Sequence, residues 1–176
     1  MNSTVLLISE EYIKNNSTVG DNTLAQYIAP SIIDSQLIGL QPIIGTHLYD
    51  TLCEMVENDG LTDDYSDLLG NYISLYLLNK VQANMMVALF AKMRNAGVVN
   101  YYDEHQTQLD LKSIQFIREE YENKAAFYAR RMQDYLCANN SKFPEYKVKR
   151  DCADLSPDKQ DSFASNFNFH KINVKH

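Results

Sequence analysis

The sequence has few of the residues that interrupt regular structure, with 6 glycines and 4 prolines among 176 residues. This scarcity argues against an all-β protein, in which frequent turns require both residue types. The sequence also has no run of about 18 apolar residues, so it predicts no transmembrane helix and no membrane partner. The N-terminus lacks a basic flank followed by a small-residue cleavage site, and we therefore expect no secretory signal peptide.

Positive charge is also in short supply. Lys and Arg total 16 against 23 Asp and Glu, which gives a formal net charge of −7 and a pI near 5.0. An acidic chain is a poor candidate for wrapping nucleic acid with its bulk surface. Apolar residues make up 45% of the chain, which is enough to bury a core and excludes disorder throughout.

Hydrophobic periodicity predicts an all-α fold. We expect an antiparallel helical bundle with two long helices, shorter N-terminal helices, a small β-prone loop and an extended C-terminal arm. The long helices are predicted at about residues 63–95 and 109–138, because apolar side chains recur there every three or four residues. Two groups of tyrosines lie on these helices and predict packing between helices or a subunit interface: Tyr65, Tyr72 and Tyr76, and Tyr121, Tyr128 and Tyr135.

The N-terminal third is predicted to be more broken. Residues 5–8 form a short apolar run that is consistent with a strand, and Ser9 is predicted to cap a short helix. Pro30 is expected to kink the next helix or to start a new one, and Gly39 and Pro42 mark a further break.

The composition changes from Lys142 onward, and we divide the chain into a helical domain, 1–146, and an extended arm, 147–176. The arm lacks helical periodicity but is rich in aromatic residues, which a free tail rarely keeps. Two interpretations remain open: the arm docks on a neighbouring molecule, for example by strand addition, or it folds back on its own bundle. The arm residues predicted to make contacts are Phe163, Phe167, Phe169 and Ile172.

A search for catalytic and metal-binding patterns finds none of the usual spacings. The paired acids are expected to be solvated or to compensate helix dipoles, and free thiols such as Cys53 and Cys137 to pack in the core. The three cysteines, with Cys152, have no motif spacing and are typical of reduced cytosolic thiols. We therefore predict no enzyme activity, no cofactor and no metal site.

Four stretches, taken in their order and spacing, resemble the small connector, or adaptor, proteins in the neck of tailed phages. The similarity covers about residues 6–146 and is strongest to versions in phages of Bacteroidales hosts, including crAss-like phages. The stretches are PIIGTHLYDTL (42–52), NAGVV (95–99), KAAFY (124–128) with Arg131, Tyr135 and Leu136, and FPEY (143–146).

The resemblance implies a structural virion protein located in the phage neck, and in the host cytoplasm during assembly. It implies a dodecameric ring beneath the portal protein that extends the DNA channel and docks the next neck or tail protein. An acidic wall suits such a channel, because DNA then passes without specific binding. We expect the loop between the long helices to contact a partner protein through Val98, Val99, Tyr101 and Tyr102.

Two other functions are compatible with the sequence. One is a helical adaptor of another multiprotein complex, or an assembly chaperone that is absent from the mature particle. The other is an enzyme whose active site forms between subunits, and its candidate catalytic residues would be His105, Cys137 and the paired acids.

Overall fold

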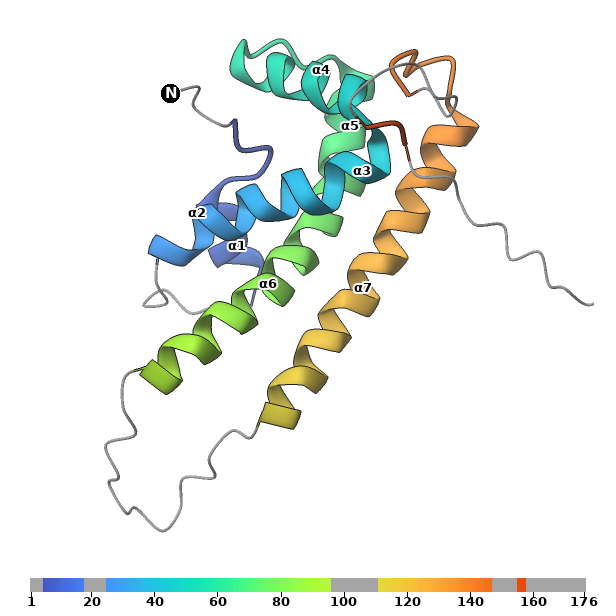
Figure 1. Cartoon of the computed structure of the whole chain (residues 1–176). Helices are drawn as coiled ribbons and strands as arrows, with labels where there is room; N and C mark the ends of the chain where they lie inside the picture. The colour runs from blue at the N-terminus through green and yellow to red at the C-terminus, as the bar shows by residue number, and fades with distance from the viewer. Residues whose placement is uncertain (1–4, 18–24, 96–110, 147–154, 158–176) are drawn as a thin grey trace, which may run out of the picture.

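The described part of the chain is helical, as predicted, and contains no strand. The computed structural model describes residues 5–17, 25–95, 111–146 and 155–157 (Figure 1). Two of its helical stretches, labelled η1 and η2, have π-helical hydrogen bonding. The elements are α1 (Glu10–Asn16), α2 (Ala25–Asp34), η1 (Ser35–Leu40), α3 (Gln41–Ile44), α4 (Thr46–Glu57), α5 (Asp63–Leu68), η2 (Leu69–Ile73), α6 (Ser74–Asn95) and α7 (Leu111–Ala138).

The two long helices are confirmed at close to their predicted bounds. The first consists of α5, η2 and α6 and runs without a break over residues 63–95, and the second is α7. As the residue number rises along the first helix, the number of its contact in and beyond α7 falls, so the helices are antiparallel. Tyr65 contacts Glu145 just beyond α7, while Tyr72 stacks on Tyr135 and Lys80 pairs with Glu122.

The core lies between these two helices and a layer formed by α2, η1 and α3, which crosses α6 (Figure 1). Each side chain that is removed from water stabilises the fold by roughly 1.5–3 kcal/mol before entropy is counted. Fully buried members of this core include Ile28, Ile32, Leu40, Ile44, Leu48, Leu52, Leu68, Ile73, Leu77, Val81, Met85, Met132, Leu136 and Phe143.

The predicted start of a new helix at Pro30 and the predicted break at Gly39 and Pro42 are wrong, because the chain stays helical from Ala25 to Ile44. The alternative expectation of a kink at Pro30 stays a prediction. Pro30 lies inside α2, where burial of Ile28 and Ile32 against the core offsets the lost backbone hydrogen bond. Pro42 is in the first turn of α3, where its missing N–H is tolerated.

The predicted strand at residues 5–8 is also wrong. This segment has no regular structure, although Leu7 and Ile8 are buried. Its backbone is satisfied by one side chain: Leu7 N donates to Gln36 Oε1 over 2.8 Å, and Gln36 Nε2 donates to the carbonyl of Val5 over 3.0 Å. The Ser9 cap is confirmed, since its hydroxyl accepts from the N–H of Tyr12.

All of the predicted tyrosines except Tyr121 pack against the core, as one of the two sequence interpretations predicted. Tyr65 and Tyr76 are buried, and the Tyr72 and Tyr135 rings stack with their centroids 4.1 Å apart.

The prediction for the cysteines is confirmed only in part. Cys53 packs against the core, whereas Cys137 is exposed near the end of α7. Cys152 lies outside the described residues.

Replacing Gln36 tests how far the N-terminal segment depends on it. Gln36→Ala leaves the N–H of Leu7 and the carbonyl of Val5 without their partner, and it opens a cavity beneath η1. We expect a loss of about 3 kcal/mol in the free energy of unfolding, measured by urea denaturation. Gln115→Ala, on the exposed side of α7, is the control and is expected to be neutral. Equal midpoints for the two variants would contradict the role assigned to Gln36.

Candidate interaction site at the α3–α4 corner

All eight residues that the sequence analysis proposed for contacts lie outside the described part of the structure. They belong to the segment between α6 and α7 and to the arm: Val98, Val99, Tyr101, Tyr102, Phe163, Phe167, Phe169 and Ile172. His105, named for the enzyme alternative, also lies outside. The candidate site is therefore built from the described stretches 42–52 and 143–146, which carry the resemblance, and from residues 155–157.

Gly45 forms a sharp corner between α3 and α4. Its φ of 82° and ψ of 156° lie in a region that side chains other than glycine rarely adopt. The N–H of Gly45 closes α3 on the carbonyl of Gln41, and its own carbonyl accepts from the N–H of Tyr49 in α4. One residue therefore ends the first helix and begins the next.

Residues 155–157 close on this corner. The N–H of Thr46 donates to the carbonyl of Leu155 over 2.9 Å, and the N–H of Leu155 donates to Thr46 Oγ1 over 3.0 Å. Pro157 is buried against Gly45, where an added Cβ would lie 2.7 Å from Pro157 Cδ. This part of the arm folds back on its own bundle, which was one of the two interpretations. The aromatic part of the arm is outside the described residues.

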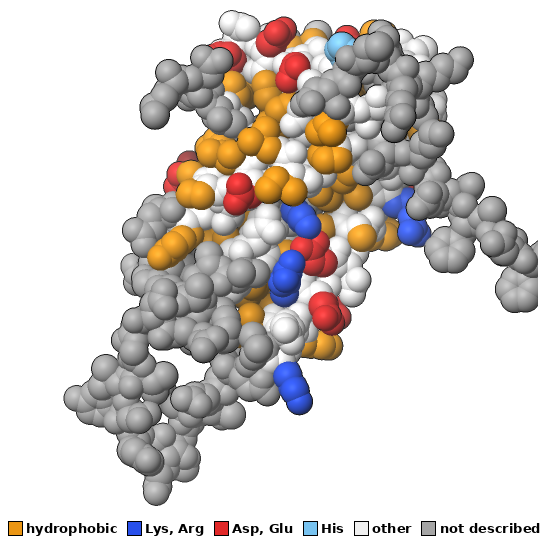
Figure 2. Space-filling view, viewed as in Figure 1, with side chains coloured by type: hydrophobic (Ala, Val, Ile, Leu, Met, Phe, Trp, Pro, Cys, Tyr) orange, Lys and Arg blue, Asp and Glu red, His pale blue; other side chains and the backbone are white. Residues whose placement is uncertain are grey.

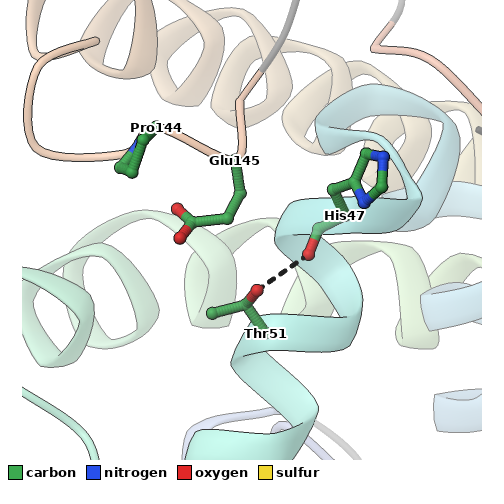
Figure 3. A pocket seen from close by; sticks show the side chains of 4 residues that line it. All are labelled: His47, Thr51, Pro144 and Glu145. Carbon is green, nitrogen blue, oxygen red and sulfur yellow. Dashed lines mark hydrogen bonds between the residues drawn. The ribbon is translucent and has the colours of Figure 1, made fainter. Parts of the chain in front are cut away.

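A shallow, open hollow of about 300 Å³ lies beside the corner, between the start of α4 and the turn after α7. Its lining is His47, Thr51, Pro144 and Glu145, so the first and last of the four stretches meet here. Figure 3 shows that the His47 imidazole and the Glu145 carboxylate point away from one another. The Thr51 hydroxyl donates to the carbonyl of His47 over 3.0 Å.

The carboxylate of Glu145 is already engaged. The Tyr65 hydroxyl donates to its Oε2 over 2.6 Å, and nearby Lys142 pairs with Asp64 over 2.6 Å. Within the described ranges, no three His, Cys, Asp or Glu side chains are grouped to hold a metal ion. The hollow is thus lined by an imidazole, a hydroxyl, a carboxylate and a proline ring.

Charge is segregated within the helical part of the chain. No Lys or Arg occurs between Lys14 and Lys80, a stretch in which all the charged side chains are Asp or Glu. Figure 2 shows the result on one face, where acidic side chains lie over α4 without a basic neighbour, and both signs alternate over α6 and α7. The acidic residues are Asp21, Asp34, Asp50, Glu54, Glu57, Asp59, Asp63, Asp64 and Asp67.

Several phenols and one thiol behind the corner are held in their neutral forms. Burial raises the pKa of Tyr49 to about 12, opposed in part by the hydrogen bond from Gln36. Burial likewise raises the pKa of Cys53 and of Tyr76, and for Tyr65 the hydrogen bond to Glu145 adds to the effect of burial on its pKa. These groups support the core from within and are not exposed nucleophiles.

The described residues define an all-α fold. Residues 40–155 match the model of a family described as a family of unknown function (DUF6712). The chain belongs to this family, and the match spans the corner, both long helices and Leu155. No curated protein and no solved structure matches the chain. No helix in the described ranges is long and apolar enough to cross a membrane.

Sequence reasoning missed the contact between the corner and residues 155–157. The available signals were a glycine directly before a helix-starting threonine and the Ser156-Pro157 pair in an arm without periodicity. Neither signal gives the partner, because the two segments are more than 100 residues apart in sequence.

The corner predicts a specific sensitivity at Gly45. Gly45→Ala adds a Cβ that clashes with Pro157 and strains the backbone, so we expect a loss of about 2 kcal/mol in the free energy of unfolding. Gly70→Ala is the matched control, since an added Cβ there meets nothing within 4 Å, and it should be neutral or stabilising by up to about 1 kcal/mol.

Adding Pro157→Ala to Gly45→Ala separates the two causes. The double variant relieves the clash but not the strained backbone, so it should recover only part of the loss. Full additivity of the two single changes, measured by urea denaturation, would contradict direct contact between Gly45 and Pro157.

The raised pKa of Tyr49 predicts a loss of stability at high pH. The unfolded phenol ionises near its ordinary pKa of 10, whereas the folded one stays protonated until about 12. The native state therefore binds more protons in this window, and stability falls as the pH rises through it, by about 2–3 kcal/mol from Tyr49. Tyr49→Phe should flatten this part of the decline in urea midpoints. An unchanged slope in the variant would contradict the assignment.

Proposed function

We propose that this protein is a structural virion protein, a head–tail connector of a tailed phage. In this proposal it forms a ring, dodecameric in the related connectors, below the portal protein. The ring extends the DNA channel and docks the next neck or tail protein. The protein acts by binding and carries out no reaction. Its place of action is the neck of the virion, after assembly in the host cytoplasm.

The observation that supports the proposal is the meeting of separate stretches at one corner. Residues 42–52 and 143–146, which carry the resemblance to phage connectors, line the same hollow although about 90 residues separate them in sequence. Gly45 and Thr46 of the first stretch also bind residues 155–157. Two of the four stretches that carry the resemblance thus contribute to one surface.

The charge distribution is consistent with passage of DNA. The stretch between Lys14 and Lys80 offers no cation to a phosphate, so a channel wall built from it would release no counterions and hold no DNA. In the proposal, the segment with Val98, Val99, Tyr101 and Tyr102 contacts the portal, and the arm with Phe163, Phe167, Phe169 and Ile172 contacts an adjacent subunit or another neck protein.

The test measures molar mass by light scattering after size exclusion, for the protein alone and mixed with the portal protein encoded in the same genome. We expect co-migration with the portal as a complex of ring size. Replacing Val98, Val99, Tyr101 and Tyr102 together with Ser should abolish co-migration. The exposed control Glu11→Ser in α1 should leave it unchanged.

A folded monomer that ignores the portal would overturn the proposal and favour an adaptor or chaperone of another complex. Equal binding by the Ser variant would overturn the assignment of the 98–102 segment alone. Helical content measured by circular dichroism distinguishes a lost contact from a lost fold.

A further inference from the structure

Two patches of exposed large apolar side chains stand out on the described surface. One is on η1, where Ile38 is 75% exposed and Leu37 is 41% exposed. The other is the outer side of α7, where Phe116 and Phe127 are each 64% exposed. Both phenylalanines lie opposite the buried stripe of Ala125 and Met132, as their spacing along the helix requires. Core packing therefore does not account for either patch.

The surroundings of Phe127 are basic. Lys124, Arg130 and Arg131 stand three or four positions away and are its neighbours on the helix surface. Two of these cations are held in place on aromatic rings: Lys124 lies 5.2 Å from the centroid of Tyr121, and Arg131 lies 4.9 Å from that of Tyr72. Phe127 is thus an aromatic side chain with a basic rim.

The exposed charge nearest to Ile38 along η1 is acidic. Asp34 precedes it by about one turn and is exposed. Lys80 lies beside the next residue, Gly39, where an added Cβ would be 3.5 Å from Lys80 Cε, and its ammonium is paired with Glu122 over 2.7 Å. Leu37 and Ile38 are thus an aliphatic patch with an exposed carboxylate nearby.

We propose that these two patches bind each other between copies of this chain. Phe127 of one copy packs on Leu37 and Ile38 of the next, and the basic rim of Phe127 faces Asp34, the exposed acid near Ile38. This inference rests on the proposed function, because it names the subunit contact from which the proposed ring is built. An apolar centre with a charged rim is the usual anatomy of a protein interface.

The geometry makes the association head to tail. The two patches lie on different elements and differ in charge, so one copy uses Phe127 for one neighbour and Ile38 for the other. Such heterologous contacts close into rings or extend into filaments. A second copy is favoured over nucleic acid as the occupant of the basic patch, because the chain carries a net charge of −7 and supplies the complementary surface itself.

Phe116 provides a matched control within the same helix. It has the same 64% exposure and the same outward side of α7 as Phe127, but its neighbours three or four positions away are Lys112, Glu119 and Glu120, which together carry a negative charge. Phe116 therefore lacks the basic rim that would complement Asp34 beside Ile38. Phe116→Ser should therefore leave association unchanged, whereas Phe127→Ser should weaken it roughly tenfold or more, as truncation of a central interface aromatic does.

The experiment is sedimentation velocity over a concentration series. We expect the wild-type chain to associate with rising concentration, and Phe127→Ser and Ile38→Ser to remain monomers when each is alone. An equimolar mixture of these two variants should form one-to-one dimers that grow no further, because each variant keeps one intact patch. Circular dichroism checks that every variant is folded.

Several outcomes would overturn the inference: a wild-type monomer at every concentration, a mixture of the two variants that stays monomeric, or a loss with Phe116→Ser equal to that with Phe127→Ser. Binding of a DNA duplex that Phe127→Ser abolishes, without an effect on association, would assign the patch to nucleic acid instead. A wild-type monomer that binds the portal would overturn the contact between copies and leave the proposed connector function standing. Association between copies without portal binding would support the contact and overturn the connector function.

Discussion

The amide of Gln36 connects the parts of the structure that surround it. Its side chain is fully buried, and a buried amide stabilises a fold only when its donor and acceptor groups are all paired. Here the acceptor takes the N–H of Leu7, and the donor serves the carbonyl of Val5 and the hydroxyl of Tyr49. One side chain thereby fixes the N-terminal segment against η1 and fixes η1 against α4.

A second contact between distant segments of the chain holds the corner between α3 and α4. Gly45 has no side chain, and the space that a Cβ would fill is occupied by Pro157. Thr46 then binds the backbone of Leu155 in both directions. The family match ends at residue 155, so the matched region includes this pair of hydrogen bonds. Residues 155–157 are therefore packed with the corner, and the division of the chain at residue 147 stays a prediction.

Periodicity was sufficient to predict the long helices, because a broad apolar stripe over residues 63–95 or 109–138 has few alternatives at that length. It failed where side chains from distant segments decide the outcome. Residues 5–8 are apolar enough for a strand, but the Gln36 side chain pairs with the backbone of Leu7 and Val5. No sequence pattern predicts Gln36 as the partner. Pro30 normally interrupts a helix, but buried neighbours on both sides outweigh the lost bond. Cys137 was assigned to the core by residue type, whereas its position on the helix places it outside.

The candidate site was predicted only through resemblance. The stretches 42–52 and 143–146 were identified in the sequence. Their contact depends on the antiparallel register of the long helices, in which Tyr65 pairs with Glu145, 80 residues later in the sequence. The patches at Ile38 and Phe127 were also within reach of sequence reasoning, since Phe127 lies opposite the apolar stripe of α7. Their significance depends on knowing which other surfaces remain exposed, and that requires the fold.

The attachment of Pro157 has a geometric consequence for everything that follows it. His176 is 19 residues further along the chain, so it lies within about 65 Å of the α3–α4 corner even when that stretch is fully extended. Pro157 thus limits how far from the corner any of these residues can lie. A surface beyond that distance cannot be contacted by them in the same molecule.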